Sequence, residues 1–477
     1  MDKKLYSRFE KVREYIWQLP KTYRKKMRVP VRVVATEGIL KEIDDGAVDQ
    51  AVNVSNLPGI VGASWMMPDA HWGYGFPVGG VAAFDLNTGI ISPGGIGFDI
   101  NCGMRSLITD LREDEVKGRI ESLVNSLFEI VPTGVGVKSD INLSGDQLKD
   151  VMVKGASWAV ENGLGEKEDL DKIEAGGRID GADPEKVSKR AIKRGLSQLG
   201  TLGSGNHYLE IQKVEKIVDK DTAQKWGIKS LGQIAVMIHC GSRGFGHQIA
   251  SDYLKVHEKS METYGIRVED KQLACAPFDS KEGKDYFSAM AAAANFAFCN
   301  RQIIAHRVRE VFSSVLGKND RELGIKQVYD VAHNIAKVEE FEVEGDDKSK
   351  SVRKLLVHRK GATRSYHGQP VIIGGSMETG SYLLVGTNHA LETTFGSTAH
   401  GSGRTMSRTK AKKMVHGKSL KEKMLQRGIY VKSATYKGLA EEAALAYKDI
   451  NEVVESVSGA GISHPVVYLK PLGNIKG

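Results

Sequence analysis

Asp99 and Cys102 are the residues of this chain whose types and spacing first point to metal chemistry. They lie three positions apart in the stretch Ile91–Arg105, which also contains the four glycines Gly94, Gly95, Gly97 and Gly103. Glycine lets the backbone adopt φ > 0 and approach a ligand closely. A thiolate is a soft ligand that can bridge two metal ions, and a nearby carboxylate adds an oxygen donor. A tight turn around a buried cysteine explains the same stretch, because free cysteines are commonly buried.

Three histidines further along the chain favour the metal interpretation. His207 follows a glycine loop, GTLGSGN, whereas His239 and His333 each come at the end of a short apolar stretch, VMIH and VYDVAH. A strand that ends in histidine and then breaks presents that side chain at a sheet edge. Together with Asp99 and Cys102 they make five possible ligands. Ligand softness alone selects zinc, because thiolate and imidazole suit zinc and manganese prefers oxygen.

A second glycine-rich and aromatic stretch, Val61–Val81, contains two further candidates. Asp69 and His71 could support the metal ligands, which usually need such partners. For Trp65 and Trp72 we expect burial in an aromatic-packed loop. His257 and His306 are interpreted as structural histidines on helices.

The pattern of apolar residues predicts a mixed fold of the α/β (α+β) class, and the glycine-rich loops would build the metal site. We find no linker and no internal repeat, and therefore expect one domain over residues 1–477. Helices are predicted at Asp2–Lys26, Ser144–Gly163, Asp183–Gly200, Tyr286–Leu316 and Leu439–Val457, the last carrying Tyr447. Strands are predicted at Met104–Asp110, around Val236–His239 (followed by a glycine turn to His247), at Val328–Asn334 and at Val466–Lys470, and an exposed hairpin tip at Glu339–Arg353.

Net charge is concentrated in one segment. The chain carries +8 with a pI near 9.0, yet Arg404–Lys437 alone has eleven Lys or Arg and one acidic residue, a net +10. Such a run can simply be a solvated helix face. We favour a track for nucleic-acid phosphates, because the run follows directly on the histidine motif HGSGR.

Composition also bears on the cellular compartment. The four cysteines have no paired spacing and fit a reducing compartment: Cys102, Cys240, Cys275 and Cys299. No apolar run is long enough to cross a bilayer, and the first 26 residues are charged throughout, unlike a signal peptide. We therefore expect a cytoplasmic protein without a membrane partner.

Several motifs, in this order, closely resemble those of the RtcB-type RNA-splicing ligases: GFDINCG, GSGNH, HCGSRG, AHN, HRKGATR, GGSM and HGSGR, with a Lys-Gly terminus. The resemblance runs from the segment PDAHWGYGFPVGG to the last residue. The acidic stretch near Asp346 is interpreted as a variable surface insertion.

The resemblance implies a GTP- and manganese-dependent ligase that joins an RNA 3′-phosphate or 2′,3′-cyclic phosphate to a 5′-hydroxyl, as in tRNA splicing and RNA repair. Cys102 would bridge two Mn²⁺ ions, one held also by His239 and His333 and the other by Asp99 and His207. This conflicts with the zinc expected from ligand softness. The nucleophile implied is His400 of HGSGR, which would take GMP on a ring nitrogen, and a neutral imidazole is a chemically sound nucleophile for that step.

The same resemblance implies the remaining contacts. Glu210 would accept from the guanine N1–H and N2–H₂ edge, Lys476 would donate to O6, and Tyr447 would stack on the base or else pack within its helix. The full set expected for GTP and GMP is Asn206, His207, Glu210, His333, Asn334, Gly374, Gly375, Ser376, Met377, Ser381, His400, Gly401, Ser402, Gly403, Tyr447 and Lys476. Candidates for RNA phosphates are Arg243, Arg404, Arg408, Lys410, Lys412 and Lys413.

The expected partners are RNA, such as tRNA halves, GTP, and the small activating protein archease that the family often uses, and the chain is expected to be a monomer. Two other functions account for parts of the pattern. A metal-dependent phosphodiesterase or phosphatase needs the ligand cluster but not HGSGR. A non-catalytic RNA-binding protein needs the basic run but not five ligands.

Overall fold

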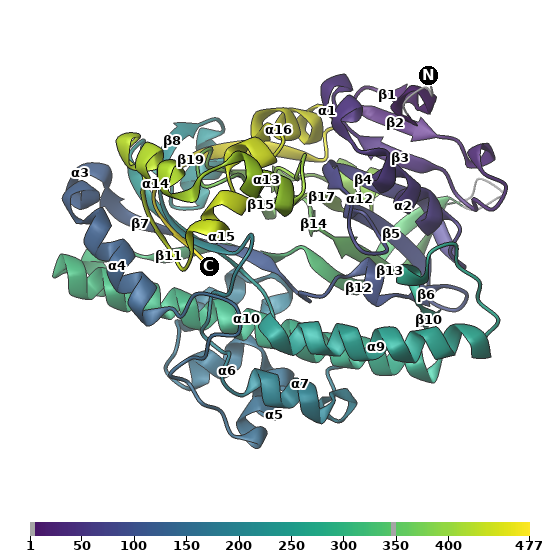
Figure 1. Ribbon diagram of the computed structural model, residues 1–477, viewed down its shortest axis with the longest axis horizontal. Helices are drawn as coiled ribbons and strands as arrows, with labels where there is room; N and C mark the ends of the chain where they lie inside the picture. The colour runs from purple at the N-terminus through teal and green to yellow at the C-terminus, as the bar shows by residue number, and fades with distance from the viewer. Residues whose placement is uncertain (1–4, 345–349) are drawn as a thin grey trace.

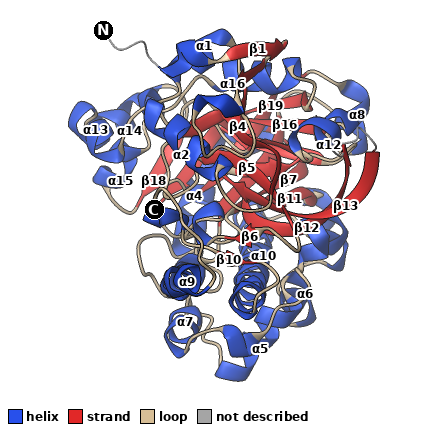
Figure 2. Cartoon of the chain, turned by 90° about the vertical axis from the view of Figure 1, so that its right-hand side faces the viewer, coloured by secondary structure: helices blue, strands red, loops and turns tan. Residues whose placement is uncertain are grey.

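Two large β-sheets share one hydrophobic core in the computed structural model, which describes residues 5–344 and 350–477 (Figure 1). Helices surround the sheets, and two long ones run beneath them (Figures 1 and 2). The mixed α/β class predicted from the sequence is confirmed. The expectation of a single domain stays a prediction.

The larger sheet supplies most of the site. Its path runs in the order β11-β7-β9-β8-β19-β16-β15, with β18 paired in parallel to β19. β9 is buried along its whole length, as its apolar sequence requires. The bounds are β7 Gly103–Arg112, β8 Tyr208–Ile217, β9 Gln233–Cys240, β11 Lys326–Ala332, β15 Pro370–Gly374, β16 Ser381–Gly386, β18 Tyr430–Ser433 and β19 Ser463–Lys476.

The second sheet has the order β1-β2-β3-β4-β5-β13-β12. Its strand β12 begins one residue after His333, and β11 of the larger sheet ends one residue before it, so this histidine marks the junction of the two sheets. The bounds are β1 Glu10–Arg13, β2 Ile16–Leu19, β3 Val31–Val34, β4 Ile60–His71, β5 Val78–Asp85, β12 Asn334–Glu344 and β13 Lys350–Lys360. Two short pairs complete the strands: β6 Ile90–Ile91 with β10 Ala276–Pro277, and β14 Ala362–Arg364 with β17 Ser397–Ala399.

The helix α10, Lys281–Leu316, is the longest in the described residues and is buried throughout its middle part, 289–305. The Ser280 side chain caps its first turn by accepting from the Gly283 backbone N–H, and Gly317 ends it in the left-handed conformation. Beside it lies α9, Arg243–Thr263, and both are covered by α5 Gly145–Lys154, α6 Ala156–Glu161 and α7 Lys189–Gly195 (Figure 1).

The remaining helices lie around the sheets (Figure 2). Their bounds are α1 Glu37–Glu42, α2 Asp45–Ser55, α3 Glu113–Val116, α4 Ile120–Ile130, α8 Lys220–Lys225, α11 Asp320–Leu323, α12 Asn388–Thr394, α13 Arg408–Met414, α14 Gly417–Gln426, α15 Tyr436–Glu441 and α16 Ile450–Gly459. No described helix is both long enough and apolar enough to span a bilayer.

The predicted N-terminal helix is wrong. Residues 5–26 form two short 3-10 turns, Leu5–Arg8 and Lys21–Tyr23, and between them the hairpin β1–β2, with Tyr15 at φ 59° in its turn. Strand β2 pairs with β3, so Ile16 and Leu19 are buried against a sheet rather than on a helix face. Pairing with a neighbouring strand has overridden a helical spacing of apolar residues. Trp65 is buried as expected, but Trp72 is exposed and its predicted burial is wrong.

Other sequence predictions hold in part. The helix at 144–163 is present but broken at Gly155, and the segment 183–200 contains a 3-10 turn, Pro184–Lys186, followed by α7. The glycine turn after His239 is limited to two residues, because α9 already begins at Arg243. The prediction of the final helix is wrong at Tyr447, because the backbone there is extended between the 3-10 turn Ala444–Ala446 and α16. The predicted strands are present, while the hairpin tip at 345–349, including Asp346, lies outside the described residues.

Candidate active site

Four strand ends of the larger sheet bring the five predicted ligands together. Asp99 and Cys102 lie in the loop that enters β7, and His207 directly precedes β8. His239 is the next-to-last residue of β9, and His333 follows β11. The strands are neighbours in register, with Gly103 opposite Cys240 and Tyr208 opposite His239. Ligands separated by up to 234 positions in the sequence therefore share one end of the sheet.

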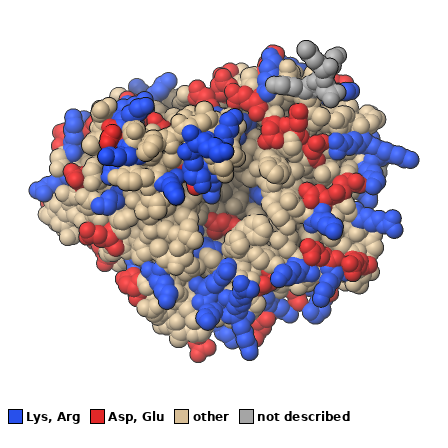
Figure 3. Space-filling view, in the orientation of Figure 1, with Lys and Arg blue, Asp and Glu red and all other residues tan. Residues whose placement is uncertain are grey.

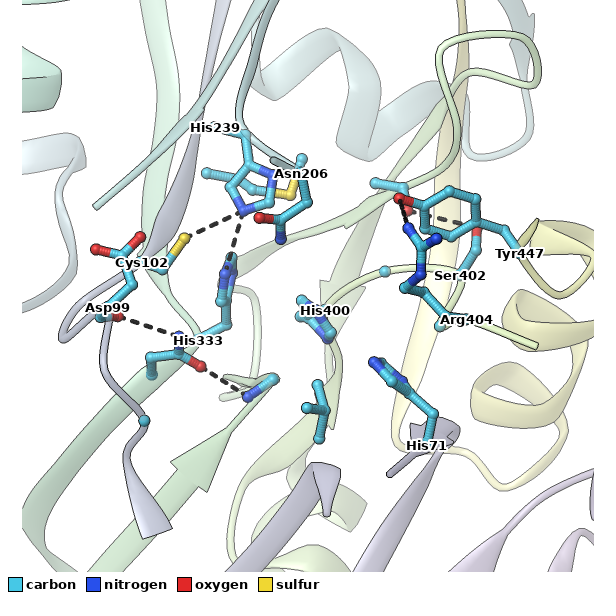
Figure 4. Close-up of a pocket in the computed structure, with 18 of the residues that line it drawn as sticks. His71, Asp99, Cys102, Asn206, His239, His333, His400, Ser402, Arg404 and Tyr447 are labelled. Carbon is cyan, nitrogen blue, oxygen red and sulfur yellow. Dashed lines mark hydrogen bonds between the residues drawn. The ribbon is translucent and has the colours of Figure 1, made fainter. Parts of the chain in front are cut away.

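The five side chains form two ligand sets that share Cys102. One set is Cys102, His239 and His333, the other is Asp99, Cys102 and His207, and the donor atoms within each lie no more than 4.8 Å apart. The Cys102 Sγ lies 3.2 Å from His207 Nε2. It lies 3.3 Å from His239 Nε2 (Figure 4). A sulfur between two imidazoles suits a thiolate that bridges two cations.

The electrostatics of the cluster favour cation binding. Burial lowers the pKa values of His239 and His333 well below the usual range, which keeps both imidazoles neutral and available as ligands. Burial alone would raise the pKa of Asp99, but the nearby His207 and Arg243 outweigh it and hold the carboxyl ionised. Burial and then Asp99 raise the pKa of Cys102. A bound cation would lower the pKa of Cys102 again, because the thiolate is the form that binds metal.

Buried polar contacts fix the loops that carry the ligands. Arg301, on α10, donates to the backbone carbonyls of Asn101 at 2.8 Å and Cys240 at 2.9 Å, while its Nε bonds Asp330. Asn101 has φ 53°, a strained value for a residue other than glycine. A Cβ at Gly241 would lie 2.5 Å from Asp99 Oδ1, so only glycine leaves room for this carboxylate.

His400 follows the short strand β17. It lines a cavity whose wall also includes the predicted ligands Asp99, Cys102, His239 and His333 (Figure 4). Its Nδ1 lies 2.6 Å from Oδ2 of Asp69, a residue with no exposed surface, and the backbone N–H groups of His400 and Gly401 donate to the same oxygen. An ionised carboxylate only accepts hydrogen bonds, so this contact places the ring proton on Nδ1 and leaves Nε2 with its lone pair. The arrangement is that of a nucleophile oriented by a buried acid.

The loop after His400 depends on a close approach to the Asp69 backbone. Gly403 has φ 72°, and a Cβ there would lie 2.1 Å from the Asp69 carbonyl oxygen. Lys448 donates to the carbonyls of Pro68 and Ala70, both at 2.8 Å, and so holds the strand on either side of Asp69. Burial lowers the pKa of Lys448 to about 8.

The cavity beside His400 has a volume of about 320 Å³, within the range of small-ligand sites. Most of the predicted nucleotide residues line it: Asn206, His333, Asn334, Gly374, Gly375, Ser376, His400, Gly401, Ser402, Gly403, Tyr447 and Lys476. The turn after β15 packs against the His400 loop, because the Gly374 N–H donates to the His400 carbonyl and the Ser402 N–H donates to that of Gly374.

The other predicted nucleotide residues lie behind the cavity wall. Glu210 is buried and accepts from Gln212 at 2.7 Å and from the Asn474 amide, and burial raises its pKa to about 7. Met377 belongs to a hydrophobic cluster with α14 and α15. Ser381 accepts from Gln212 at 3.3 Å, and His207 faces the metal ligands.

Tyr447 and Arg404 form one wall of the cavity (Figure 4). The Arg404 guanidinium lies 5.0 Å from the ring centroid of Tyr447 and covers one face of the ring. The Tyr447 hydroxyl donates to Glu442, and Arg404 also donates to the Glu441 carbonyl at 2.8 Å. A base stacked on Tyr447 therefore has a single face available.

The predicted RNA-binding residues divide into two groups. Arg404 and Arg408 line the cavity, and Arg243 lies 3.0 Å from His207 through its Nη1. The lysines of α13 lie outside it, Lys412 pairing with Glu441 at 2.8 Å while Lys410 and Lys413 are exposed.

From the sequence, Asp69 was a possible supporting partner of the metal ligands, whereas in the structure its carboxylate bonds His400. The two residues are 331 positions apart and no spacing rule connects them. Lys360 was not singled out. It lines the cavity and holds the loop before the metal ligands by donating to the Phe76 carbonyl at 3.0 Å and the Gly94 carbonyl at 3.1 Å. Its position in the motif HRKGATR was the available signal.

The fold and the site define a mixed α/β protein built around a cysteine-bridged double ligand set and an oriented histidine. A family model described as tRNA-splicing ligase RtcB matches residues 50–477. Relatives named tRNA-splicing ligase RtcB are 52% identical in Archaeoglobus fulgidus and 49% identical in Thermococcus kodakarensis, each over 98% of both chains. The relative of that name in Pyrobaculum aerophilum is 48% identical over 98% of this chain and 99% of its own. This chain belongs to the RtcB family of tRNA-splicing ligases.

Proposed function

We propose that this protein joins RNA 3′-phosphate or 2′,3′-cyclic phosphate ends to 5′-hydroxyl ends through a GMP adduct on His400. The observation that carries the proposal is the 2.6 Å contact from Asp69 to His400 Nδ1, which leaves Nε2 free beside the ligand cluster. The His400 ring centroid lies 4.7 Å from that of His333, so a phosphate on Nε2 lies close to both ligand sets.

Cys102, His239 and His333 would hold one metal ion, and Asp99, Cys102 and His207 the other. Each set has three protein donors and leaves coordination positions open for phosphate oxygens. The donor types alone suit zinc, whereas family membership supports manganese, and the proposal is manganese. Bound ions of either kind would neutralise phosphate charge and help orient the reacting groups.

The reaction proceeds in three displacements at phosphorus. His400 Nε2 attacks the α-phosphorus of GTP, an N–P bond forms, and pyrophosphate leaves. An oxygen of the RNA 3′-phosphate then attacks the GMP phosphorus, and the bond to His400 breaks. The 5′-hydroxyl oxygen finally attacks the activated 3′-phosphate, GMP leaves, and the hydroxyl proton passes to solvent. A cyclic phosphate is first hydrolysed to a 3′-phosphate.

The protein's own groups contribute positioning in each step. Asp69 holds the His400 ring and stabilises the positive charge that forms on it when Nε2 is phosphorylated. Tyr447 offers one ring face to the guanine, with Ser376, Ser402 and Lys476 around the remainder of the cavity. Glu210 acts on the base only if it moves or acts through a neighbour, because its oxygens already accept from Gln212 and Asn474.

The test is covalent labelling. The protein is incubated with α-labelled GTP and Mn²⁺, denatured, and examined for label on the polypeptide, with Zn²⁺ and Mg²⁺ in parallel. We expect label on the unaltered protein with Mn²⁺ and none on His400→Ala. Absence of label under every metal, with the protein folded and the ions bound, would instead favour the metal-dependent phosphodiesterase. The proposal further includes a cytoplasmic location, a monomeric state and an archease-type activator.

A further inference from the structure

The protein has another cavity, which the proposed site does not use. Its volume is about 550 Å³, within the range of small-ligand sites. Figure 3 shows a hollow near the centre of one face, beneath basic side chains over α13, and Arg408 of that helix lines the cavity beside His400. The other cavity shares no lining residue with that one, and we call it the Trp226 cavity after its one tryptophan.

Five segments of the chain enclose the Trp226 cavity. They are the 3-10 turn Lys167–Lys172, the end of α8, the C-terminal part of α10, the helix α11 and the first residues of β11. Strand β11 is the last strand on its side of the larger sheet. The cavity therefore lies along a sheet edge, away from the strand ends that carry the metal ligands.

Two buried side chains that line this cavity have polar atoms without a hydrogen-bond partner in the described part of the chain. They are Arg309, 7% exposed, and Gln327, 6% exposed. Both Nη atoms of Arg309 donate to the Asp169 carboxylate, at 2.9 and 2.7 Å, while its Nε is unpaired. The Gln327 Nε2 donates to the Asp169 carbonyl at 3.3 Å and the Lys172 carbonyl at 2.8 Å, while its Oε1 is unpaired. One donor and one acceptor are thus held in place without a partner, which is uncommon for buried groups.

The same buried network that holds the metal-ligand loops also holds this pair. Asp169 accepts from Gln302 at 2.7 Å, and Gln302 accepts from Arg105 at 2.5 Å. Arg105 donates to Asp330 at 2.7 Å, and Asp330 also accepts from Arg301. Side chains that are already fixed lose little freedom when a ligand binds. The floor of the Trp226 cavity is therefore preorganised for a ligand.

An aromatic ring and unpaired charges complete the lining. Trp226, at the end of α8, is half-buried. Three exposed lysines and three exposed carboxylates also line the cavity. Among the residues that the structure describes, none of these six has an ion pair: Lys172, Lys225, Lys326, Glu166, Glu168 and Asp320.

A nucleotide is a small molecule that uses all of these groups. Lysines contact phosphates, carboxylates accept from ribose hydroxyls, and aromatic rings stack on bases. The unpaired Arg309 Nε and Gln327 Oε1 require one acceptor and one donor on the base. The edge of adenine with N7 and N6–H₂ presents one of each, whereas the same edge of guanine presents two acceptors. A peptide offers donors and acceptors but no phosphate.

We propose that the Trp226 cavity binds an adenine nucleotide such as ATP, separately from the guanine nucleotide expected beside His400. The base stacks on Trp226 and bonds Arg309 and Gln327, while the phosphates contact the three lysines. This assignment does not depend on the ligase mechanism, because none of these residues belongs to the ligand cluster or to the His400 cavity.

The test is equilibrium dialysis of the full chain against labelled ATP and Mg²⁺, without GTP or Mn²⁺. The lysine variant has Lys172, Lys225 and Lys326 changed to Gln. The control variant has the same charge change at three exposed lysines that line neither cavity, Lys21, Lys25 and Lys216. Trp226→Leu removes the ring, and Tyr447→Ala alters the cavity beside His400. Labelled adenosine and an RNA of three adenylates are measured in parallel.

We expect one ATP per unaltered chain. The lysine variant should bind ATP about ten-fold more weakly or worse, because it loses charged contacts to phosphate. Its affinity for adenosine, which has no phosphate, should be unchanged. Trp226→Leu should weaken ATP and adenosine alike, by about ten-fold, because stacking serves both. The control variant and Tyr447→Ala should bind ATP as the unaltered protein does.

Absence of ATP binding by the unaltered protein, equal weakening in the lysine and control variants, or loss of ATP binding in Tyr447→Ala would each overturn the assignment. Binding of the adenylate RNA without binding of ATP would overturn it as well, because the cavity would then accept a strand rather than a free nucleotide. Labelling by GTP is a separate measurement, and its absence with ATP binding intact would count against the ligase mechanism alone.

Discussion

Asp69 is the residue that orients His400, the proposed nucleophile. Its Oδ2 accepts from the His400 ring and from two backbone N–H groups of the same turn, so one oxygen fixes both the tautomer and the position of the side chain. Changing Asp69 to Asn keeps an oxygen that can accept from Nδ1 and from the two backbone N–H groups, but it removes the negative charge that would stabilise the ring when Nε2 is phosphorylated. We expect the rate of GTP labelling to fall by about 10²–10⁴.

Metal content is the control for that variant. Asp69 is in neither ligand set, so Asp69→Asn should retain both ions by elemental analysis while it loses labelling. Loss of metal together with labelling would mean that the residue supports the ligand cluster, as the sequence alone suggested.

Glu210 is a second residue whose effect can be measured, here as a dependence of stability on pH. Burial raises its pKa from 4.5 to about 7. The native state therefore binds more protons than the unfolded chain between those values, and the free energy of unfolding falls as pH rises through this window. The change amounts to about 3 kcal/mol between pH 4.5 and pH 7.

The matching variant is Glu210→Gln, which keeps the hydrogen-bonding shape without a titrating group. Thermal unfolding at pH 5 and pH 8 should show a smaller loss of stability in the variant than in the unaltered protein. An identical pH dependence in both would show that the Glu210 carboxylate is stabilised by Gln212 and Asn474 at neutral pH.

At the scale of elements, the turn between β17 and α13 sets the distance between His400 and Asp69. Gly403 occupies it at φ 72°, with no room for a Cβ beside the Asp69 backbone. Gly403→Ala should displace the turn and reduce GTP labelling more than 100-fold. Gly428 is a matched control, because it has φ 78° and no atom within 4 Å of a Cβ. Gly428→Ala should keep its activity and cost about 1 kcal/mol of stability.

Full labelling of Gly403→Ala would show that the turn tolerates a shift, and that the close approach to Asp69 is not needed for the reaction. Equal losses in both glycine variants would attribute the effect to backbone strain instead.

Elements also show how far sequence reasoning reaches in this protein. Strands that deliver a histidine at their end were predictable, because β9 contains the apolar run Ile234–Ile238 directly before His239, and β11 ends one residue before His333. The structure of residues 5–26 was not predictable, since their apolar spacing fits a helix and pairing with the neighbouring strand β3 decides otherwise. Tyr447 was likewise predicted on a helix. Its backbone is instead extended, and its hydroxyl contacts Glu442 and Arg404.

Contacts between distant segments account for the remaining differences. The expected metal ligands were predicted because aspartate, cysteine and histidine are residue types that bind metal ions. The partner of His400 was not, because an aspartate in a glycine-rich loop has many roles and only the fold brings Asp69 next to it. The resemblance to the family supplied the expected nucleotide-binding residues, and most of them line one cavity.

At the scale of the whole molecule, the ligand cluster lies where the two sheets meet, so metal binding should stabilise the entire chain. Ions that bind only the native state raise the free energy of unfolding by about 2.7 kcal/mol per site at a hundred times Kd. Cys102 belongs to both ligand sets, whereas His207 and His333 belong to one each. We expect two Mn²⁺ ions per unaltered chain, one in His207→Ala or His333→Ala, and none at this cluster in Cys102→Ala.

The increase in Tm on adding Mn²⁺ should follow the same order: largest in the unaltered protein, about half in each histidine variant, and lost in Cys102→Ala. Asp69→Asn should behave like the unaltered protein, which separates the nucleophile from the metal cluster. Retention of one ion by Cys102→Ala would mean that the sulfur does not bridge, and that two independent sites lie at the end of the sheet. Because β12 begins directly after His333, the ion held by Cys102, His239 and His333 would then be the one that couples the two sheets.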